Sequence, residues 1–124
     1  MPKTDVLIFA ERDGNSPFLQ WLDKQPAKVQ DKCIVFIERL AEYGHELRRP
    51  QADFLEDGIY ELRIKRQGIN YRILYFFHEN RAIISHGFVK QEGKVPVKEI
   101  KDAVKNRTAF LANPGERQYK EEYA

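Results

Sequence analysis

The fold of this chain is decided by residues 60–94, which read YELRIKRQGINYRILYFFHENRAIISHGFVKQEGK. Apolar and polar side chains alternate over residues 60–66, which is the period of a half-buried β-strand. The runs 69–77 and 81–90 are rich in aromatic and β-branched residues, which strands prefer. Gln67-Gly68 and Glu79-Asn80 separate the three runs as tight turns. The stretch therefore predicts three consecutive strands.

The polar positions of these strands are mainly basic. Arg63 and Lys65 lie two residues apart, so they share one face of the first strand. Arg72 stands alone inside the apolar second strand, and the third strand ends with His86 and Lys90. The three strands therefore predict a sheet with a basic working surface.

The charge of the whole chain is distributed unevenly. Residues 1–62 carry 8 basic and 12 acidic side chains, whereas residues 63–124 carry 13 and 7, within a net charge of +2. Such asymmetry predicts an anionic partner, and nucleic acid is the commonest one. The alternative is a basic helix face that only contacts solvent.

Length and composition indicate a single globular domain. The chain has 124 residues, of which 42% are hydrophobic and 32% charged. We expect the domain to span residues 1–112 and a polar tail to span 113–124. The sequence lacks an apolar run of about 20 residues and a signal segment, so we expect a cytoplasmic protein with no membrane partner. Cys33 is the single cysteine, and no histidine or cysteine spacing is typical of a metal site, so we expect no metal and no cofactor.

The segments that flank the three strands complete the predicted fold. Residues 5–10 predict a first strand, and Ser16-Pro17 predicts the start of a short helix. A longer helix is expected from Pro26 to Tyr43, and residues 45–52 are expected to be a loop. A last helix follows Pro96. The resulting order, β-α-α-β-β-β-α, predicts an α+β fold with a small, mainly antiparallel sheet and helices packed on one face.

Apolar stripes define the buried sides of the two long helices. The first stripe contains Cys33, which we interpret as a packed core thiol rather than a nucleophile. The stripes are Val29, Cys33, Phe36, Ile37 and Leu40 in the first helix, and Val97, Ile100, Val104 and Leu111 in the last.

Several of these segments resemble the RelE/ParE toxin superfamily, and within it the phage-derived HigB-like branch. The segments are DGIYELR at residues 57–63, NYRILYF at 70–76, HGFVK at 86–90, and Pro96 with Glu99-Ile100 at the start of the last helix. The resemblance extends from about Phe18 to Leu111. It implies a RelE-like fold.

The resemblance also implies a function and partners. Relatives are toxins of type II toxin-antitoxin systems that cleave messenger RNA in the ribosomal A site, where they also contact ribosomal RNA. A small helix-turn-helix antitoxin is implied as the partner, and operator DNA is bound only through that antitoxin. The alternatives are a ParE-like gyrase inhibitor and an RNA-binding protein without catalysis.

The residues fit a metal-independent endoribonuclease in which the 2′-hydroxyl of the substrate attacks the phosphate. Arg63 and Arg72 are expected to clamp the phosphate oxygens, since guanidinium groups offer paired hydrogen bonds. His86 is the expected general acid/base because histidine side chains titrate near neutral pH. Lys65 or Lys90 is the alternative, and all five residues are expected to be catalytic.

Four further residues are expected to bind RNA. The rings of Tyr71 and Phe88 could stack on splayed bases, and Lys94 and Lys98 could contact the RNA backbone. Two alternatives stay open at the catalytic positions. Arg72 could be a buried structural arginine paired with Glu61, and His86 could only satisfy a hydrogen bond of the core.

Overall fold

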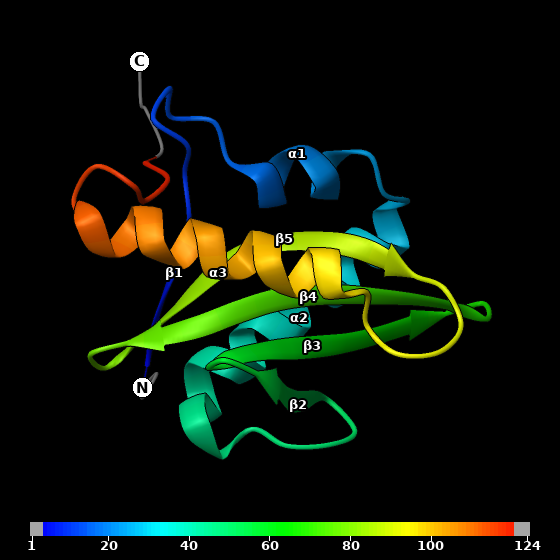
Figure 1. Cartoon of the computed structure of the whole chain (residues 1–124). Helices are drawn as coiled ribbons and strands as arrows, with labels where there is room; N and C mark the ends of the chain where they lie inside the picture. The colour runs from blue at the N-terminus through cyan, green and yellow to red at the C-terminus, as the bar shows by residue number, and fades with distance from the viewer. Residues whose placement is uncertain (1–3, 121–124) are drawn as a thin grey trace.

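The computed structural model describes residues 4–120. Figure 1 shows a twisted sheet with helices on both of its sides. The elements are β1 (Asp5–Ile8), α1 (Pro17–Asp23), α2 (Ala27–Tyr43), a short 3-10 helix η1 (Gly44–Glu46), β2 (Ala52–Glu56), β3 (Ile59–Arg66), β4 (Ile69–His78), β5 (Arg81–Lys90) and α3 (Val97–Ala112).

The five strands form one sheet in the order β1-β5-β4-β3-β2. β1 runs parallel to β5, and the other neighbours are antiparallel. The hairpin between β3 and β4 turns at Gln67-Gly68, where both residues have positive φ angles, 51° and 80°. A two-residue turn of this kind matches the twist of the strands it joins. The structure confirms the predicted α+β class and the three-strand meander.

The helices cover both faces of the sheet rather than one. On one face, which we call the helix-pair face, α1 and α2 pack on β4 through Ile73 and Tyr75. On the other, the α3 face, α3 packs on Leu74 and Phe76 of the same strand. Because successive residues of a strand point to opposite sides, the apolar run of β4 requires cover on both sides. The expectation that the helices pack on one face is therefore wrong.

β2 was not predicted as a strand. It is a five-residue edge strand that pairs with β3, and its ladder shifts register between Phe54 and Glu56. The predicted loop over residues 45–52 therefore ends where this strand begins. Its short length and two acidic residues gave no clear strand period, and Phe54 is 52% exposed.

The helix boundaries follow the predicted caps. Ser16 Oγ accepts a hydrogen bond from the Leu19 N–H at 3.1 Å and caps α1, and Gly44 ends α2. The stripe predicted for α2 packs in the core beneath the helix-pair face. The stripe of α3 differs at its ends, where Val97 and Leu111 are exposed. Ile100, Ala103 and Phe110 form the buried side of α3.

A β-bulge in β5 changes the direction of its last side chains. Leu74 pairs with His86 but Tyr75 pairs with Ile84, so Ser85 is the extra residue. Bulges re-aim the side chains that follow them. Without the bulge, the period of two would place His86 on the helix-pair face beside Ile84. With it, His86 and Phe88 lie on the α3 face.

The first residues of the predicted tail dock on the end of β1. Phe9 forms an antiparallel bridge with Gln118, and the N–H groups of Ala10 and Tyr119 donate to Arg117 and Ile8 carbonyls at 2.9 and 2.7 Å. This short ladder extends the folded unit beyond α3. The last part of the predicted tail, residues 121–124, lies outside the described residues.

Candidate functional site

A hollow of about 410 Å³ opens on the α3 face, between β2, β3 and the loop from β5 to α3. We call it the arginine cleft. Five basic and three acidic side chains line it, so positive charge prevails. The charged lining residues are Arg49, Asp53, Glu56, Glu61, Arg63, Arg72, Lys90 and Lys94.

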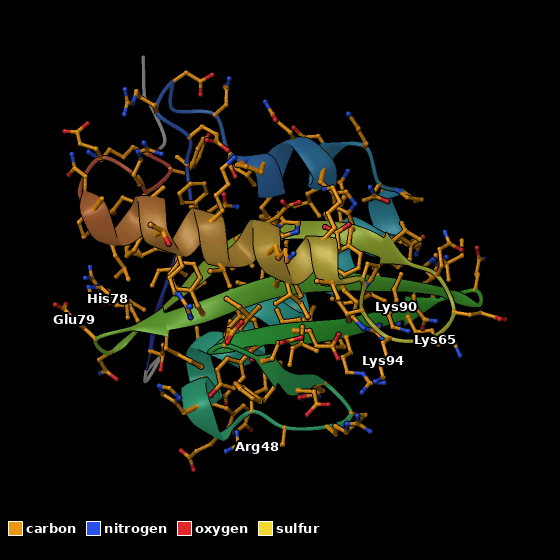
Figure 2. All side chains as sticks on the ribbon, in the orientation of Figure 1. Arg48, Lys65, His78, Glu79, Lys90 and Lys94 are labelled. Carbon is orange, nitrogen blue, oxygen red and sulfur yellow. The ribbon has the colours of Figure 1, made fainter. Side chains whose placement is uncertain are left out.

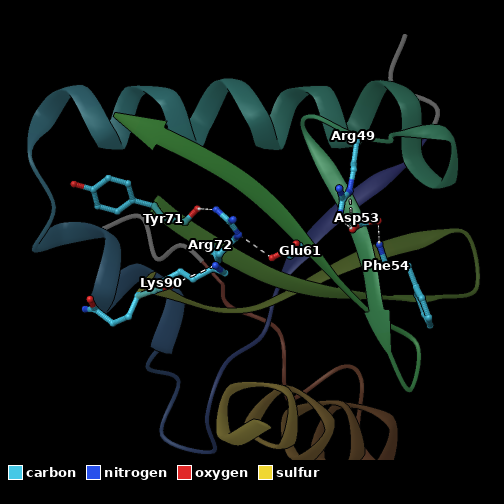
Figure 3. A network of polar contacts seen from close by, with 8 residues as sticks. Arg49, Asp53, Phe54, Glu61, Tyr71, Arg72 and Lys90 are labelled. Carbon is cyan, nitrogen blue, oxygen red and sulfur yellow. Dashed lines mark hydrogen bonds and ion pairs between the residues drawn. The ribbon is translucent and has the colours of Figure 1, made fainter. Parts of the chain in front are cut away.

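A buried ion pair lies in the wall of the arginine cleft. Arg72 and Glu61 are each 4% exposed, and Arg72 Nε donates to Glu61 Oε1 at 2.8 Å (Figure 3). Burial lowers the pKa of Arg72 from its ordinary value, Glu61 raises it, and Arg63 lowers it further. Arginine nevertheless stays protonated in proteins. The structure thus forms the Arg72–Glu61 pair that the sequence left open, while Arg72 still lines the cleft.

Arg63 lies directly opposite Arg72 in the β3–β4 ladder. Like charges that face each other across two strands are destabilising. Arg63 is partly exposed, and among residues 4–120 it forms no ion pair with a carboxylate. An anion placed beside the two guanidinium groups would offset this repulsion and accept paired hydrogen bonds. The opposed arginines are therefore a candidate anion-binding feature of the cleft.

Three lysines surround the opposed arginines. Figure 2 shows Lys65, Lys90 and Lys94 at the same end of the sheet, far from His78 and Glu79. Lys90 and Lys94 line the arginine cleft, and Lys90 Nζ donates to its neighbour's carbonyl at 3.3 Å. Lys65 lines an adjoining hollow of about 480 Å³ that shares Arg63 and Arg72 with the cleft. The structure thus brings together five of the predicted basic residues.

His86 lies in a different hollow. On β5 the side chains of His86, Phe88 and Lys90 follow one another on the α3 face, so four residues, or about 13 Å, separate His86 from Lys90. Phe88, which is 8% exposed, stands between them. His86 lines a hollow of about 630 Å³ on the other side of α3, which we call the histidine hollow. The structure does not bring His86 into the arginine cleft.

Hydrogen bonds fix the ring of His86 in this hollow. Its Nε2 lies 3.0 Å from Glu99 Oε1, and its Nδ1 lies 2.9 Å from Ser85 Oγ. Asn106 Nδ2 donates to the same Ser85 oxygen at 2.9 Å. An ionised Glu99 carboxylate can only accept, so Nε2 carries a proton and donates it to Glu99. In the neutral ring Nδ1 then accepts from the Ser85 hydroxyl, a tautomer that is assigned from the hydrogen-bond pattern.

The remaining predicted RNA-binding residues are dispersed. Tyr71 is 4% exposed on the helix-pair face, where its ring forms a T-shaped contact with the ring of Trp21. The two ring centroids are 6.4 Å apart. This placement leaves no free ring face for a base, so the stacking expected of Tyr71 does not fit the structure. Phe88 packs in the core beneath α3. Lys98 is exposed at the histidine hollow and forms an ion pair of 2.7 Å with Asp102.

Sequence reasoning missed residues at both hollows. Arg49 forms an ion pair of 2.8 Å with Asp53 at the arginine cleft, and its hydrogen bond lowers the pKa of Asp53. These residues belong to the unpredicted β2 and the loop before it. In the histidine hollow, Glu99 and Asp102 lie three residues apart, which on a helix is one face. The spacing of these two acidic residues could therefore have been recognised from the sequence.

The fold and the arginine cleft define a class: a small α+β protein with a cationic site at one end of its sheet. Residues 20–108 match the model of the family described as phage-derived protein Gp49-like (DUF891). The chain therefore belongs to this family, which is a toxin-like family of the RelE/HigB type. A comparison with curated proteins finds no match.

A separate observation concerns membranes. None of the helices within residues 4–120 is both long enough and apolar enough to span a bilayer.

Proposed function

We propose that this protein is the toxin of a type II toxin-antitoxin system and cleaves messenger RNA in the ribosomal A site. The observation that carries the proposal is the pair of opposed arginines, Arg63 and Arg72, in a cleft with Lys90 and Lys94. Membership of a toxin-like family supports it. A helix-turn-helix antitoxin is the proposed partner, and operator DNA is bound through that antitoxin.

The proposed reaction uses the nucleophile of the substrate. The 2′-hydroxyl oxygen forms a bond to the adjacent phosphorus, the bond from phosphorus to the 5′-oxygen breaks, and a 2′,3′-cyclic phosphate remains. The 2′-hydroxyl proton passes to a base, and the leaving 5′-oxygen gains a proton. Arg63 and Arg72 stabilise the charge that develops on the phosphoryl oxygens.

The proton transfers are assigned to lysines near the cleft rather than to His86. Within residues 4–120 no histidine lines the arginine cleft, and His86 lies beyond Phe88 in the other hollow. Lys65 and Lys90 flank the opposed arginines from β3 and β5. The cleft is shallow, so the ribosome must supply the orientation of the message. Isolated RNA is then a poor substrate.

A second candidate function is binding without cleavage, as in an RNA-binding toxin or a gyrase inhibitor. The observation that favours it is the buried pair, because Glu61 already occupies Nε of Arg72. An arginine held in this way can bind a phosphate group as a fixed positive charge, without cleavage of the phosphodiester bond.

Primer extension on translating ribosomes tests the proposal. Arg63→Ala is the informative variant because Arg63 is partly exposed and its loss leaves no buried charge unpaired. Removal of one transition-state donor is expected to reduce cleavage about 10²- to 10³-fold. Arg81→Ala is the matched control, since Arg81 is a partly exposed strand arginine at the far end of β5. The His86→Ala variant is expected to keep cutting.

Three outcomes decide between the candidates. Ribosome-dependent cuts that vanish in Arg63→Ala and persist in Arg81→Ala support cleavage at the arginine cleft. Intact message beside growth arrest excludes the nuclease, and DNA-damage signalling would then indicate gyrase. Loss of cutting in His86→Ala, with the variant still folded, would return the acid/base role to the histidine.

A further inference from the structure

We propose that the histidine hollow is a binding site for a divalent transition-metal ion, with Zn²⁺ as the ion to test first. The ligands are His86 Nε2 and one carboxylate oxygen each from Glu99 and Asp102, which all lie within 4.8 Å of one another. The site is separate from the arginine cleft and does not depend on the proposed nuclease.

The composition of the cluster suits such an ion. One neutral imidazole and two carboxylates match the charge of a divalent cation, and Zn²⁺ sites with three protein ligands use these groups. The imidazole favours a transition metal over Mg²⁺, which prefers oxygen ligands and water. The hollow of about 630 Å³ leaves room for a water as the fourth ligand.

The geometry requires a small closure. His86 Nε2 and Glu99 Oε1 are 3.0 Å apart, so an ion about 2.1 Å from each fits between them once the Nε2 proton has left. The limit of 4.8 Å within which the three ligand atoms lie is wider than the separation of about 4.2 Å that two such bonds allow. Asp102 is the most exposed of the three and can close this gap by rotating its side chain.

The surroundings of His86 support the ligand role. The bulge at Ser85 turns His86 toward α3, and without it the ring would face away from both carboxylates. When Nε2 binds a metal, the ring proton moves to Nδ1, where the rotated hydroxyl of Ser85 accepts it. Ser85 is fully buried and held by Asn106. A hydrogen bond of this kind to the second ring nitrogen is typical of metal-binding histidines.

Within the described part of the chain, three cationic side chains that line the hollow oppose the ion, Lys98, Lys105 and Arg117, and Lys98 is the one that contacts a ligand carboxylate. Its ammonium donates to Asp102 Oδ2 at 2.7 Å, where it neutralises one of the two carboxylates. The Lys98 side chain is 78% exposed, so it can leave this position. Its removal therefore has a diagnostic sign: Lys98→Ala tightens the binding of a cation and weakens the binding of an anion in the same hollow.

Isothermal titration calorimetry of the full chain, without an affinity tag, tests the site with ZnCl₂. One saturable site is expected, with affinity reduced at least 10-fold in Glu99→Gln and Asp102→Asn and increased in Lys98→Ala. Glu99→Gln keeps an oxygen that accepts from His86, so the fold is preserved. The matched control is His78→Gln, because His78 forms a second His–Glu pair with Glu79 at the far end of the sheet.

A second measurement covers variants that fold poorly. Co²⁺ bound at a site with nitrogen and oxygen ligands has visible absorption, which should appear with wild type and His78→Gln and be lost in Asp102→Asn. The inference is overturned if wild type shows no saturable binding, or if binding survives in both carboxylate variants. It is also overturned if His78→Gln abolishes binding, or if Lys98→Ala weakens it.

Discussion

The helix-pair face and the α3 face of the sheet differ in what they bury. Beneath α1 and α2 the core is mainly apolar, and its buried titratable groups include the Cys33 thiol and the Tyr75 phenol. On the α3 face one helix covers the sheet between two hollows, and each hollow contains a hydrogen-bonded pair of a basic side chain and a glutamate, Arg72–Glu61 or His86–Glu99. Two helices exclude water from their face, whereas a single helix leaves open flanks where charged groups can act. Both candidate sites therefore lie on the less covered face.

The largest effect should come from breaking the buried pair of the α3 face. Arg72→Ala leaves Glu61 in the sheet without its partner, and a buried charge left unpaired costs about 3–5 kcal/mol. Urea unfolding followed by circular dichroism measures this loss. The double variant Arg72→Met with Glu61→Leu should recover most of it, because apolar groups of similar size replace both charges. A loss below about 1 kcal/mol for Arg72→Ala would show that water reaches the pair.

The helix-pair face should respond to added volume instead. A Cβ at Gly87 would lie 2.3 Å from Cε3 of Trp21, so Gly87→Ala should destabilise the fold by about 1–3 kcal/mol through overpacking. Gly115→Ala is the control, because nothing lies within 4 Å of its Cβ position. In thermal unfolding, the Trp21→Leu substitution should lower the stability less in the Gly87→Ala variant than in wild type. If the stability losses of the two substitutions simply add, the methyl group added by Gly87→Ala does not meet Trp21.

The smallest effect concerns pH and the thiol of the helix-pair face. Burial raises the pKa of Cys33 from 9.0 to about 11. The unfolded chain therefore loses this proton first, so the stabilisation is complete below pH 9 and is lost as the pH rises toward 11. Urea midpoints between pH 7 and 10.5 should fall less for Cys33→Ala than for wild type. Burial also raises the pKa of Tyr75, so the difference between the two proteins isolates the thiol. If the urea midpoints of the two proteins fall equally with pH, the thiol makes no such contribution.

Local patterns predicted most of the fold. The alternation over residues 60–66, the Gln67-Gly68 turn and the Ser16-Pro17 start depend on neighbours in sequence, and the structure confirms them. Two features depend on contacts distant in sequence and were missed. β2 exists because β3 offers it a partner, and α3 covers the second face because β4 is apolar on both sides.

The candidate site was predicted less completely than the fold. Period-two spacing placed Arg63 and Lys65 on one face, and the hairpin register set Arg72 beside them. The same spacing could not reveal the bulge at Ser85, because one extra residue in a ladder leaves no mark in a single sequence. That bulge, with Phe88, places His86 in a separate hollow.

The ladder between Phe9 and Gln118 has a consequence for synthesis of the chain. β1 emerges from the ribosome first, yet its partners are β5 and the residues after α3. At about 5–20 residues per second, the interval between Phe9 and Gln118 lasts roughly 5–22 s. Until β5 is made the first strand lacks its neighbour in the sheet, and until Gln118 is made the ladder at Phe9 stays open. The segment that closes this ladder is therefore the last part of the described fold to be synthesised.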